Sequence, residues 1–600
     1  MAKKWQIAPP IDTEFINQFP EIPLLVLQLM HNRGLLTQKA IDEFLNPDYG
    51  QDSHSPFLFK DMAKAVAEIF STIEKKEKIA VYGDYDADGV CGSVILTETL
   101  SALGGQVEVY IPHREKEGYG LNLTAVKELA NNGIKLIITT DCGITNLKET
   151  VLANELGLRV IITDHHQPAA SPASRDKQAG KPASPPAGGL PAALAVINPK
   201  VVGEEYPFKE LAGVGVAYKL VQALVEEDKK NPPAAPIGGG GKKLPAGFEK
   251  WLLDLVAIGT IADISPILGE NRTIVKYGLV VLNKTRRLGL KILMEEAGLS
   301  GEVNTQNVAF QLAPRFNAAG RLNHANAVYK LMITGSTKEA RSLAEELNRT
   351  NQERQRLTDQ ILTEIRNSWG EVDAKEKVLF AIGDSWPVGV VGLVAGKLCD
   401  EYYRPVLVMT RLSGSASRRI TGSGRSIAEF NITDALAKTN GLLSRFGGHS
   451  QACGFTIERE ENLEKFKAKL IKVAEKELKG KDLSPRLEVD ATVPLKEINW
   501  KIFEQLAKFE PFGEDNKQPK FLALGEEVFN FQPVGNDGKH LRIFLKDETG
   551  KIHKTIGFCF GDWCQRLKIG ERVDIVFEVD VNEWNGNREL QFKIIDLRLT

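Results

Sequence analysis

The sequence predicts an α/β protein in which two α/β lobes are joined by a long helix and followed by a small all-β barrel. Three observations support this prediction. Short apolar runs alternate with helical segments between Lys78 and Asp164. A charged segment without proline or glycine follows at 338–369, and residues 483–600 alternate apolar and polar side chains. Six hundred residues suffice for three or four such domains.

The composition excludes several classes of protein. The chain is 42% hydrophobic and 26% charged, with a formal net charge of -2, so a polyanion partner must be held by local basic patches. The six cysteines contain no C-x-x-C pair, which argues against a zinc ribbon or a disulfide framework. No segment approaches the roughly 18 apolar residues of a membrane span. We therefore expect a soluble, cytoplasmic protein without a membrane partner.

Four short apolar segments in the first lobe predict a parallel sheet. They read KIAVYGD, QVEVYIP, KLIITTD and LRVIITD, and three of them end in aspartate, at Asp84, Asp141 and Asp164. Continuous apolar runs separated by helices are typical of parallel strands buried on both faces. The carboxyl ends of parallel strands meet at one edge of the sheet, so we expect these carboxylates to gather there.

Changes in sequence pattern divide the chain into four parts. We assign residues 1–337 to an N-terminal segment and a first, catalytic domain, and 338–370 to a connecting helix. A second α/β domain is expected at 371–482, beginning with KVLFAIGD. Residues 483–600 contain short alternating strands and the turn Asn585-Gly586, which predict a small barrel, with the OB fold as one candidate.

The densest chemical signal is Asp84-Tyr-Asp86-Ala-Asp88-Gly89. Three carboxylates this close repel one another unless cations lie among them. The hexapeptide matches the start of an EF-hand calcium loop, but the twelfth position is Ile95 instead of glutamate and a buried strand precedes the motif. The sequence therefore predicts a metal site at the end of a strand.

Further acids and two imidazoles follow apolar runs elsewhere in the chain. Carboxylates mixed with imidazole suit Mn, Fe, Zn or Co better than calcium. A single aspartate at a strand end is often only a helix cap, but that explanation fits poorly for six acids and two histidines at one edge. So many ligands favour two ions, which could serve a nuclease, an aminopeptidase or a phosphatase. The additional groups are Asp141, Asp164, His165, His166 and Asp263.

Three basic loops and one glycine-rich segment have the chemistry to hold phosphates. Guanidinium groups fork onto phosphate oxygens, and small residues let the backbone approach closely. Each loop alone could be a solvated arginine beside a turn, whereas together they favour a phosphate polymer. The candidates are Arg114, Arg315, Asn317, Arg321, Ser423, Arg425, Ser426, Gly447, Gly448 and His449.

Several motifs in order resemble known families. GDYDADG, TTDCG, TDHH and GTIAD resemble the metal-binding motifs of the DHH phosphoesterase superfamily. PHREKEGYGLN, LAGVGVAYK, APRFNAAGRL and LNRTNQERQ resemble the RecJ family of single-strand-specific 5′-to-3′ DNA exonucleases. GDSWPVGVVGLVAGKL, SGRS and FGGHSQACGF resemble a DHHA1 substrate-binding domain, and LAKFEPFGEDNKQPKF resembles the segment before the OB domain of RecJ. The resemblance extends from about residue 20 to the carboxyl terminus.

The resemblance implies roles for the acidic and histidine residues. His166 would lie against the scissile phosphate and act in catalysis together with Asp86 and Asp88, and the cofactor would be two ions of Mn²⁺ or Mg²⁺. The sequence departs from the family pattern in two Pro/Gly-rich insertions, predicted to be flexible, near 168–193 and 231–247. The implied metal ligands or their close supports are Asp84, Asp86, Asp88, Asp141, Asp164, His165 and Asp263.

We therefore predict a metal-dependent exonuclease that degrades single-stranded DNA from the 5′ end to 5′-mononucleotides, in DNA repair and recombination. The polarity follows from the resemblance alone. A channel between the two lobes would admit one strand and exclude a duplex, and the barrel would add a stacking surface. A single-strand-binding protein and a helicase are the protein partners that this function suggests. Two alternatives stay open: a DHH phosphodiesterase of short oligonucleotides or cyclic dinucleotides, and a non-catalytic replication scaffold.

Overall fold

The computed structural model resolves two compact units, which we describe separately. The first contains 53–265 and 273–483, and the second contains the segment ending at Asp52 together with 266–272 and 484–600. The two predicted insertions fall largely on 169–188 and 231–243, outside the described residues. The described residues are 3–168, 189–230, 244–373, 375–412, 419–439, 441–584 and 586–600.

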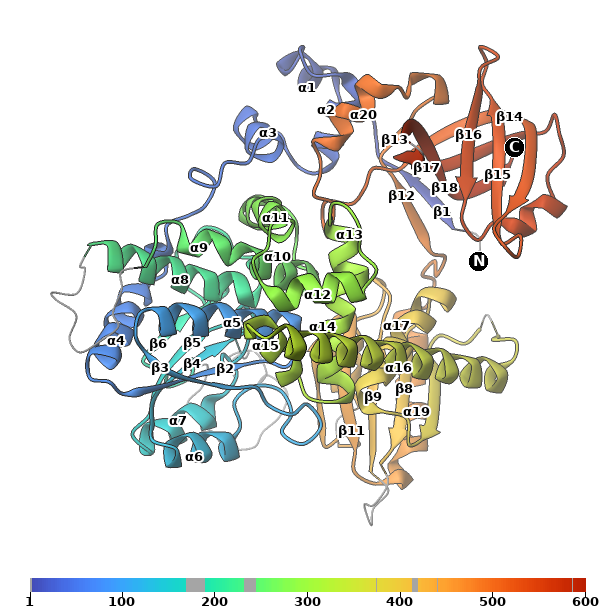
Figure 1. The fold of residues 1–600 in the computed structure, drawn as a ribbon. Coiled ribbons are helices and arrows are strands. Elements are labelled where there is room, and N and C mark those ends of the chain that lie inside the picture. The colour runs from blue at the N-terminus through green and yellow to red at the C-terminus, as the bar shows by residue number, and fades with distance from the viewer. Residues whose placement is uncertain are drawn as a thin grey trace. The chain divides into compact units, whose positions relative to one another are not determined.

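The first domain of the first unit is built on the predicted parallel sheet. All of its strands are parallel, in the order β3-β2-β4-β5-β6. Figure 1 shows α6 and α7 on one face of this sheet, and α4, α5 and α8 on the other. The strands are β2 (Lys78–Gly83), β3 (Gln106–Tyr110), β4 (Ile134–Thr140), β5 (Arg159–Thr163) and β6 (Ala195–Ile197). The helices around them are α4 (Met62–Glu74), α5 (Ala87–Ala102), α6 (Leu123–Asn131), α7 (Leu147–Glu155), α8 (Gly213–Lys230), α9 (Phe248–Trp251) and α10 (Leu253–Ala262).

Helix α5 starts directly on the strand ends because its first turns carry glycine. A Cβ atom on Gly89 would lie 2.6 Å from the backbone nitrogen of Asp84, and one on Gly92 would lie 2.1 Å from Oγ1 of Thr140. The side chain of Asp86 caps the helix by accepting hydrogen bonds from the N–H groups of Asp88 and Gly89. This close fit brings the aspartates of the hexapeptide to the edge of the sheet.

A group of helices follows the sheet and leads into the long helix predicted at 338–370. Helix α16 (Thr337–Trp369) begins at Ser336, whose side chain accepts from the N–H of Glu339. One face is buried, with Ala340, Ala344 and Leu347 at helical spacing, and the opposite face is charged. The preceding helices are α11 (Gly269–Leu282), α12 (Leu288–Glu296), α13 (Thr305–Asn307), the π-helix η3 (Val308–Leu312), α14 (Ala313–Leu322) and α15 (Asn326–Ile333).

The second α/β domain has a mixed sheet in the order β10-β11-β9-β8-β7. Only β7 and β8 pair in parallel, and the other neighbours are antiparallel. Helix α17 packs on β8 and β9. The elements are β7 (Leu379–Asp384), α17 (Val388–Tyr402), β8 (Val406–Arg411), β9 (Ile420–Arg425), α18 (Ile432–Ala437), β10 (Arg445–His449), β11 (Ala452–Ile457) and α19 (Leu463–Glu477).

The second unit contains the predicted all-β barrel. The strand order β13-β14-β15-β16-β18-β17, closed by pairing of β14 with β17, is that of an OB fold. Asn585 lies outside the described residues, and Gly586, with φ +80°, separates β17 from β18. The strands are β13 (Ala491–Thr492), β14 (Phe521–Val534), β15 (His540–Lys546), β16 (Ile552–Gly557), β17 (Arg572–Trp584) and β18 (Asn587–Leu599).

The N-terminal segment belongs to the barrel unit, whereas the sequence pattern groups it with the first domain in residues 1–337. Strand β1 pairs in parallel with β12, and the side chains of the first three helices join the apolar core of the barrel. Among the described residues, no helix is both long and apolar enough to cross a membrane. The elements are β1 (Lys4–Ile7), α1 (Thr13–Gln18), α2 (Leu24–Asn32), α3 (Gln38–Leu45), β12 (Arg486–Val489) and α20 (Trp500–Ala507).

A buried arginine joins the end of α3 to the segment 508–511 in this unit. The guanidinium of Arg272 donates to the carbonyl oxygens of Phe44, Phe509, Pro511, Lys508 and Glu510, at distances of 2.8 to 3.4 Å. It also lies 3.9 Å from the centre of the Phe44 ring. Burial lowers the pKa of Arg272 to about 9. Because all five carbonyls come from loops or a helix end, this one side chain replaces hydrogen bonds that a regular element would make.

Glu526 on β14 should make the stability of the barrel depend on pH. Burial raises the pKa of Glu526 to about 7, and the nearby charge of Asp547 acts in the same direction. The folded state therefore binds the proton of the Glu526 carboxyl more tightly than the unfolded state, in which the pKa is near 4.5. The stabilisation that this proton gives the folded state is lost as the pH rises through 7. We expect Glu526→Gln to stabilise the barrel at pH 8 by about 2 kcal/mol and to have little effect at pH 5. Urea unfolding, followed by pulsed hydrogen exchange of β14 at pH 5 and pH 8, measures this change in stability. Glu527→Gln is the control. An equal effect of Glu526→Gln at both pH values would contradict the prediction.

Candidate metal centre and substrate site

The predicted acids and histidines meet at the carboxyl edge of the first sheet. Asp84 follows β2, Asp141 follows β4, and the triplet from Asp164 to His166 follows β5. Asp86 and Asp88 lie at the start of α5. The run before Asp263 is helix α10, and Asp263 is the residue at its C-cap. The structure therefore brings all eight predicted residues to one region.

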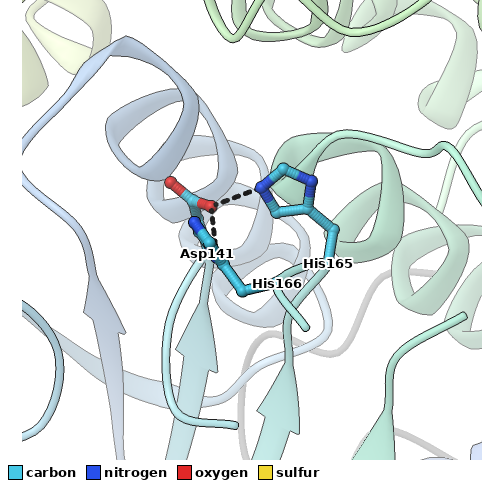
Figure 2. A group of neighbouring side chains, drawn as sticks. All are labelled: Asp141, His165 and His166. Carbon is cyan, nitrogen blue, oxygen red and sulfur yellow. Dashed lines mark ion pairs between the residues drawn. The ribbon is translucent and has the colours of Figure 1, made fainter. Parts of the chain in front are cut away.

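Three groups of side chains place their ligand atoms within 4.8 Å of one another: Asp84, Asp86 and Asp141; Asp88, His165 and Asp263; and Asp141, His165 and His166. Figure 2 shows the third group, in which both imidazoles pair with one carboxylate. Oδ1 of Asp141 lies 3.2 Å from Nε2 of His165 and 3.7 Å from Nδ1 of His166. Asp141 and His165 each belong to two groups, so the groups form one continuous cluster.

The chemistry of this cluster fits divalent cations. Within the described part of the chain, Oδ1 of Asp84, Oδ1 of Asp141 and Nε2 of His165 are buried without a hydrogen-bond partner. Burial and the neighbouring carboxylates raise the pKa values of Asp84, Asp88 and Asp141 well above their usual range. Burial also lowers the pKa of His165, which favours a neutral ring with a lone pair for a metal. Bound cations would neutralise the repulsion and occupy the unpartnered atoms.

Backbone hydrogen bonds fix the carboxylates in place. The two oxygens of Asp88 accept from the N–H groups of Gly213 and Val214 at the start of α8, at 2.7 and 2.8 Å. Asp164 accepts from the N–H of Ile144 and from both the N–H and Nδ1 of His166. Burial alone would raise the pKa of Asp164, but its hydrogen bonds to His166 and Ile144 and the charge of His166 together outweigh burial and lower the pKa. Asp164 lies in none of the three groups, and its hydrogen bonds suit it to support His166.

Two further residues contact His166 and were not found in the sequence. The hydroxyl of Tyr119 donates to the carbonyl oxygen of Asp141 at 2.9 Å and lies 3.0 Å from Nδ1 of His166. The side chain of Asn198 donates to the carbonyl oxygen of His166 at 2.9 Å. Tyr119 stands between Gly118 and Gly120, both with positive φ, so the motif Gly-Tyr-Gly was a signal that could have drawn attention to it.

Four arginines gather near the metal cluster. The guanidinium of Arg114 lies 4.9 Å from the centre of the Tyr85 ring. Burial lowers the pKa of Arg321 to about 10, and the charges of Arg114, Arg354 and Arg425 act in the same direction, while Asp86 opposes them. Arg354, on the long helix α16, was not among the predicted residues. Positive charge from both domains of the first unit thus gathers around Arg321, which itself interacts with Asp86.

The other predicted phosphate contacts differ in whether their polar atoms already have hydrogen-bond partners within the protein. Arg425 donates to Oγ of Ser423 at 3.1 Å, and Arg315 donates to the carbonyl oxygen of Gln311 at 2.6 Å. The hydroxyl of Ser426 is buried and donates to the carbonyl oxygen of Phe430. Oδ1 of Asn317 accepts from the N–H of Ala87 at 2.8 Å. Gly447, Gly448 and His449 lie together on the exposed edge strand β10.

Family comparisons cover most of the chain. The DHH family N-terminal domain matches residues 78–260, the DHHA1 domain matches 375–476, and the RecJ OB domain matches 489–596. A similar solved structure is RecJ in complex with Mn²⁺ from Thermus thermophilus, with a TM-score of 0.80 and 29% identity, which covers 100% of this chain and 80% of that chain. RecJ from the same organism in complex with Mg²⁺ has a TM-score of 0.73 and 27% identity, covering 100% of this chain and 78% of that one.

Curated relatives agree with these matches. The single-stranded-DNA-specific exonuclease RecJ of Bacillus subtilis is 36% identical over 599 residues, which covers 99% of this chain and 70% of the relative. The protein of the same name from Escherichia coli is 30% identical, with 96% of each chain covered. Both curated relatives match this chain over almost its full length, and the three domain models match it in order. The chain belongs to the RecJ family.

Proposed function

We propose that this protein hydrolyses single-stranded DNA from the 5′ end and releases 5′-mononucleotides, with two Mn²⁺ or Mg²⁺ ions held by the acid cluster. As a member of the RecJ family it is a metal-dependent exonuclease specific for single-stranded DNA. The observation that carries the proposal is the convergence of six aspartates and two histidines at the edge of the first sheet, near a group of arginines. Among the described residues, three buried ligand atoms of this cluster have no hydrogen-bond partner.

The ligands would be Asp84, Asp86, Asp88, Asp141, His165 and Asp263. When bound, divalent cations supply charge neutralisation at the phosphodiester and activation of the attacking water. The protein's own part is to hold the ligands rigid, which the caps and backbone hydrogen bonds of Asp86 and Asp88 achieve. Ligands that are already held in place need little rearrangement when charge develops on the phosphate during the reaction.

His166 is proposed to face the scissile phosphate. Burial alone would lower its pKa, but the hydrogen bond and the charge of Asp164 outweigh burial and raise it. The proton on Nδ1 is held between the Asp164 carboxylate and the Tyr119 hydroxyl, which leaves Nε2 for a substrate oxygen. A raised pKa favours the imidazolium form, so this nitrogen can donate a hydrogen bond to a phosphate.

We assign the substrate phosphates to Arg114, Arg315, Arg321, Ser423 and Arg425, with Gly447, Gly448 and His449 on the edge strand. Ser426 is omitted because its side chain is buried and its hydroxyl donates to the carbonyl oxygen of Phe430. In the second unit, a hollow of about 490 Å³ on the barrel is lined by Arg542, Lys554 and Gln591, among others, and is the proposed single-strand surface of the barrel. A single-strand-binding protein and a helicase are the protein partners that this function suggests.

Hydrolysis of labelled DNA tests the proposal. With Mn²⁺, a single strand labelled at its 5′ end should release labelled mononucleotide at once, whereas a 3′ label should stay on long fragments until late. Blunt duplex should be resistant, and a duplex with a 5′ tail should be degraded. Release from the 3′ end first, or equal degradation of blunt duplex, would overturn the polarity or the strand selectivity. Activity confined to cyclic dinucleotides or very short oligonucleotides would favour the alternative DHH phosphodiesterase.

Removing the hydroxyl of Tyr119 should slow catalysis without weakening substrate binding. In Tyr119→Phe the ring remains, but Nδ1 of His166 loses one of its two partners and the Asp141 carbonyl loses its donor. We expect kcat to fall about tenfold, a loss equivalent to one hydrogen bond, with KM for single-stranded DNA unchanged. Steady-state kinetics check this, and Tyr110→Phe serves as a control because it also removes a phenolic hydroxyl, one that bonds to Glu117 instead of His166. A higher KM at constant kcat would instead assign Tyr119 to substrate binding.

A further inference from the structure

Helix α14 lies directly on the loop that carries the metal ligands. This metal loop, defined here as residues 84–88, contacts the helix at two points. Oδ1 of Asn317 accepts a hydrogen bond from the N–H of Ala87 at 2.8 Å, although the two residues are 230 positions apart. A Cβ atom on Gly320 would lie 2.3 Å from the carbonyl oxygen of Tyr85, so only glycine permits this approach. The helix therefore packs closely on the loop, with a side-chain hydrogen bond at Asn317 and a backbone-to-backbone contact at Gly320.

The hydrogen bond from Ala87 completes the start of α5. The first N–H groups of a helix have no partner within the helix. The side chain of Asp86 satisfies those of Asp88 and Gly89, and Asn317 satisfies that of Ala87. Ala87 stands between Asp86 and Asp88, which belong to two different ligand groups. One amide oxygen from a distant helix thus holds the residue that connects the two groups.

The C-terminal end of α14 also contacts the second α/β domain. Nη1 of Arg321 donates to the carbonyl oxygen of Gly389 at 3.0 Å, and a Cβ atom on Gly389 would lie 2.3 Å from the carbonyl oxygen of Arg321. One turn further along α17, Gly392 faces the side chains of Ser423 and Arg425. Helix α14 therefore links the metal loop to the helix that supports the proposed phosphate contacts.

We propose that Asn317 is a positioning residue for metal binding: its side-chain oxygen fixes the N–H of Ala87 and thereby holds Asp86 and Asp88 in the geometry that binds the cations. The sequence had suggested a phosphate contact for Asn317, but the oxygen of its amide is engaged by the metal loop. The inference rests on the proposed function only in taking the acid cluster as the cation site.

Binding of Mn²⁺ to the full-length protein without DNA tests this role, using the electron paramagnetic resonance signal of free Mn²⁺. Asn317→Ala should raise the Kd for Mn²⁺ about tenfold, because one hydrogen bond to the loop is lost. Asn317→Asp should keep the wild-type affinity, since its carboxylate oxygen can accept the same bond. Asn323→Ala, at the end of the same helix, should have no effect because that side chain donates to Thr350 on α16.

Single-stranded DNA binding, measured by fluorescence anisotropy in EDTA, separates positioning from phosphate contact. Positioning predicts an unchanged Kd for DNA in both Asn317 variants, and a kcat that falls in Asn317→Ala but is preserved in Asn317→Asp. A phosphate contact predicts the opposite: weaker DNA binding in both variants, most strongly in Asn317→Asp, where a negative charge replaces an N–H donor. That result, or wild-type Mn²⁺ affinity in Asn317→Ala, would overturn the proposal.

Two further outcomes keep the test decisive. If Asn317→Ala fails to fold, Asn317→Gln provides the same comparison, because it keeps an amide but moves the oxygen by one methylene and should also weaken Mn²⁺ binding. If the wild-type protein binds Mn²⁺ but does not degrade single-stranded DNA, the proposed function fails, while the effect of Asn317 on the Mn²⁺ affinity is still measured independently.

Discussion

Replacing Asp86 by alanine is expected to reduce hydrolysis of single-stranded DNA by about 1,000-fold while leaving binding of the strand nearly intact. Asp86 shares a ligand group with Asp84 and Asp141, whose buried Oδ1 atoms have no hydrogen-bond partner among the described residues. Without its carboxylate, cations bound at this group would lose an anchoring charge. The proposed phosphate contacts come from arginines on other elements, so the Kd for DNA in EDTA should change little.

The variant Asp86→Asn separates the proposed metal-binding role of Asp86 from its role as a helix cap. Its carboxylate also caps α5, and loss of a cap costs about 1 kcal/mol of stability. Asp86→Asn can still accept from the N–H groups of Asp88 and Gly89 but carries no charge. We expect it to lose hydrolysis as Asp86→Ala does, yet to melt at the wild-type temperature. Full hydrolysis by Asp86→Asn at saturating Mn²⁺ would remove Asp86 from the set of metal ligands.

Replacing Arg272 by methionine is expected to destabilise the barrel unit by about 3–5 kcal/mol. Methionine has a similar length and can pack on Phe44, but it offers no donor to the five carbonyl oxygens that the guanidinium satisfies. Buried carbonyls left without a partner incur a desolvation penalty, so the loss should exceed that of one ordinary hydrogen bond. Hydrogen exchange of residues 484–600 in the full-length protein measures it.

The control for this prediction is Arg286→Met. Arg286 also lies over an aromatic ring, 3.6 Å from the centre of Trp251, but it is exposed and belongs to the first unit. Its loss should cost less than about 1 kcal/mol and should not change exchange in the barrel. If Arg272→Met exchanged like the wild-type protein, the five hydrogen bonds would contribute nothing net to stability.

Local sequence patterns were sufficient to predict the main architecture. Continuous apolar runs that end in Asp84, Asp141 and Asp164 identified the strands of the parallel sheet, because a strand buried on both faces has no polar alternation. The segment rich in helix formers identified α16 almost to the residue, since its bounds depend on the Ser336 cap and on Gly370. The convergence of the acids followed from one topological rule, that parallel strands align their carboxyl ends.

Contacts between distant segments could not be predicted in the same way. The placement of β1 beside β12, the five acceptors of Arg272 and the bond from Ala87 to Asn317 join residues separated by more than 200 positions. For Asn317 the residue type allowed both a phosphate contact and a backbone contact. For Tyr119 the flanking glycines indicated an unusual turn, but nothing in them indicated His166.

The sequence alone determined the types of the elements, their order and the chemical character of the acidic edge, because these depend on side-chain periodicity and on residues adjacent in the chain. Only the tertiary structure decided which partner each polar atom has: that Asp164 supports His166, that Ser426 bonds to Phe430, and that Asn317 holds the metal loop. The reason is physical. A buried polar group must find a partner wherever folding places one, and that choice is made by packing between elements.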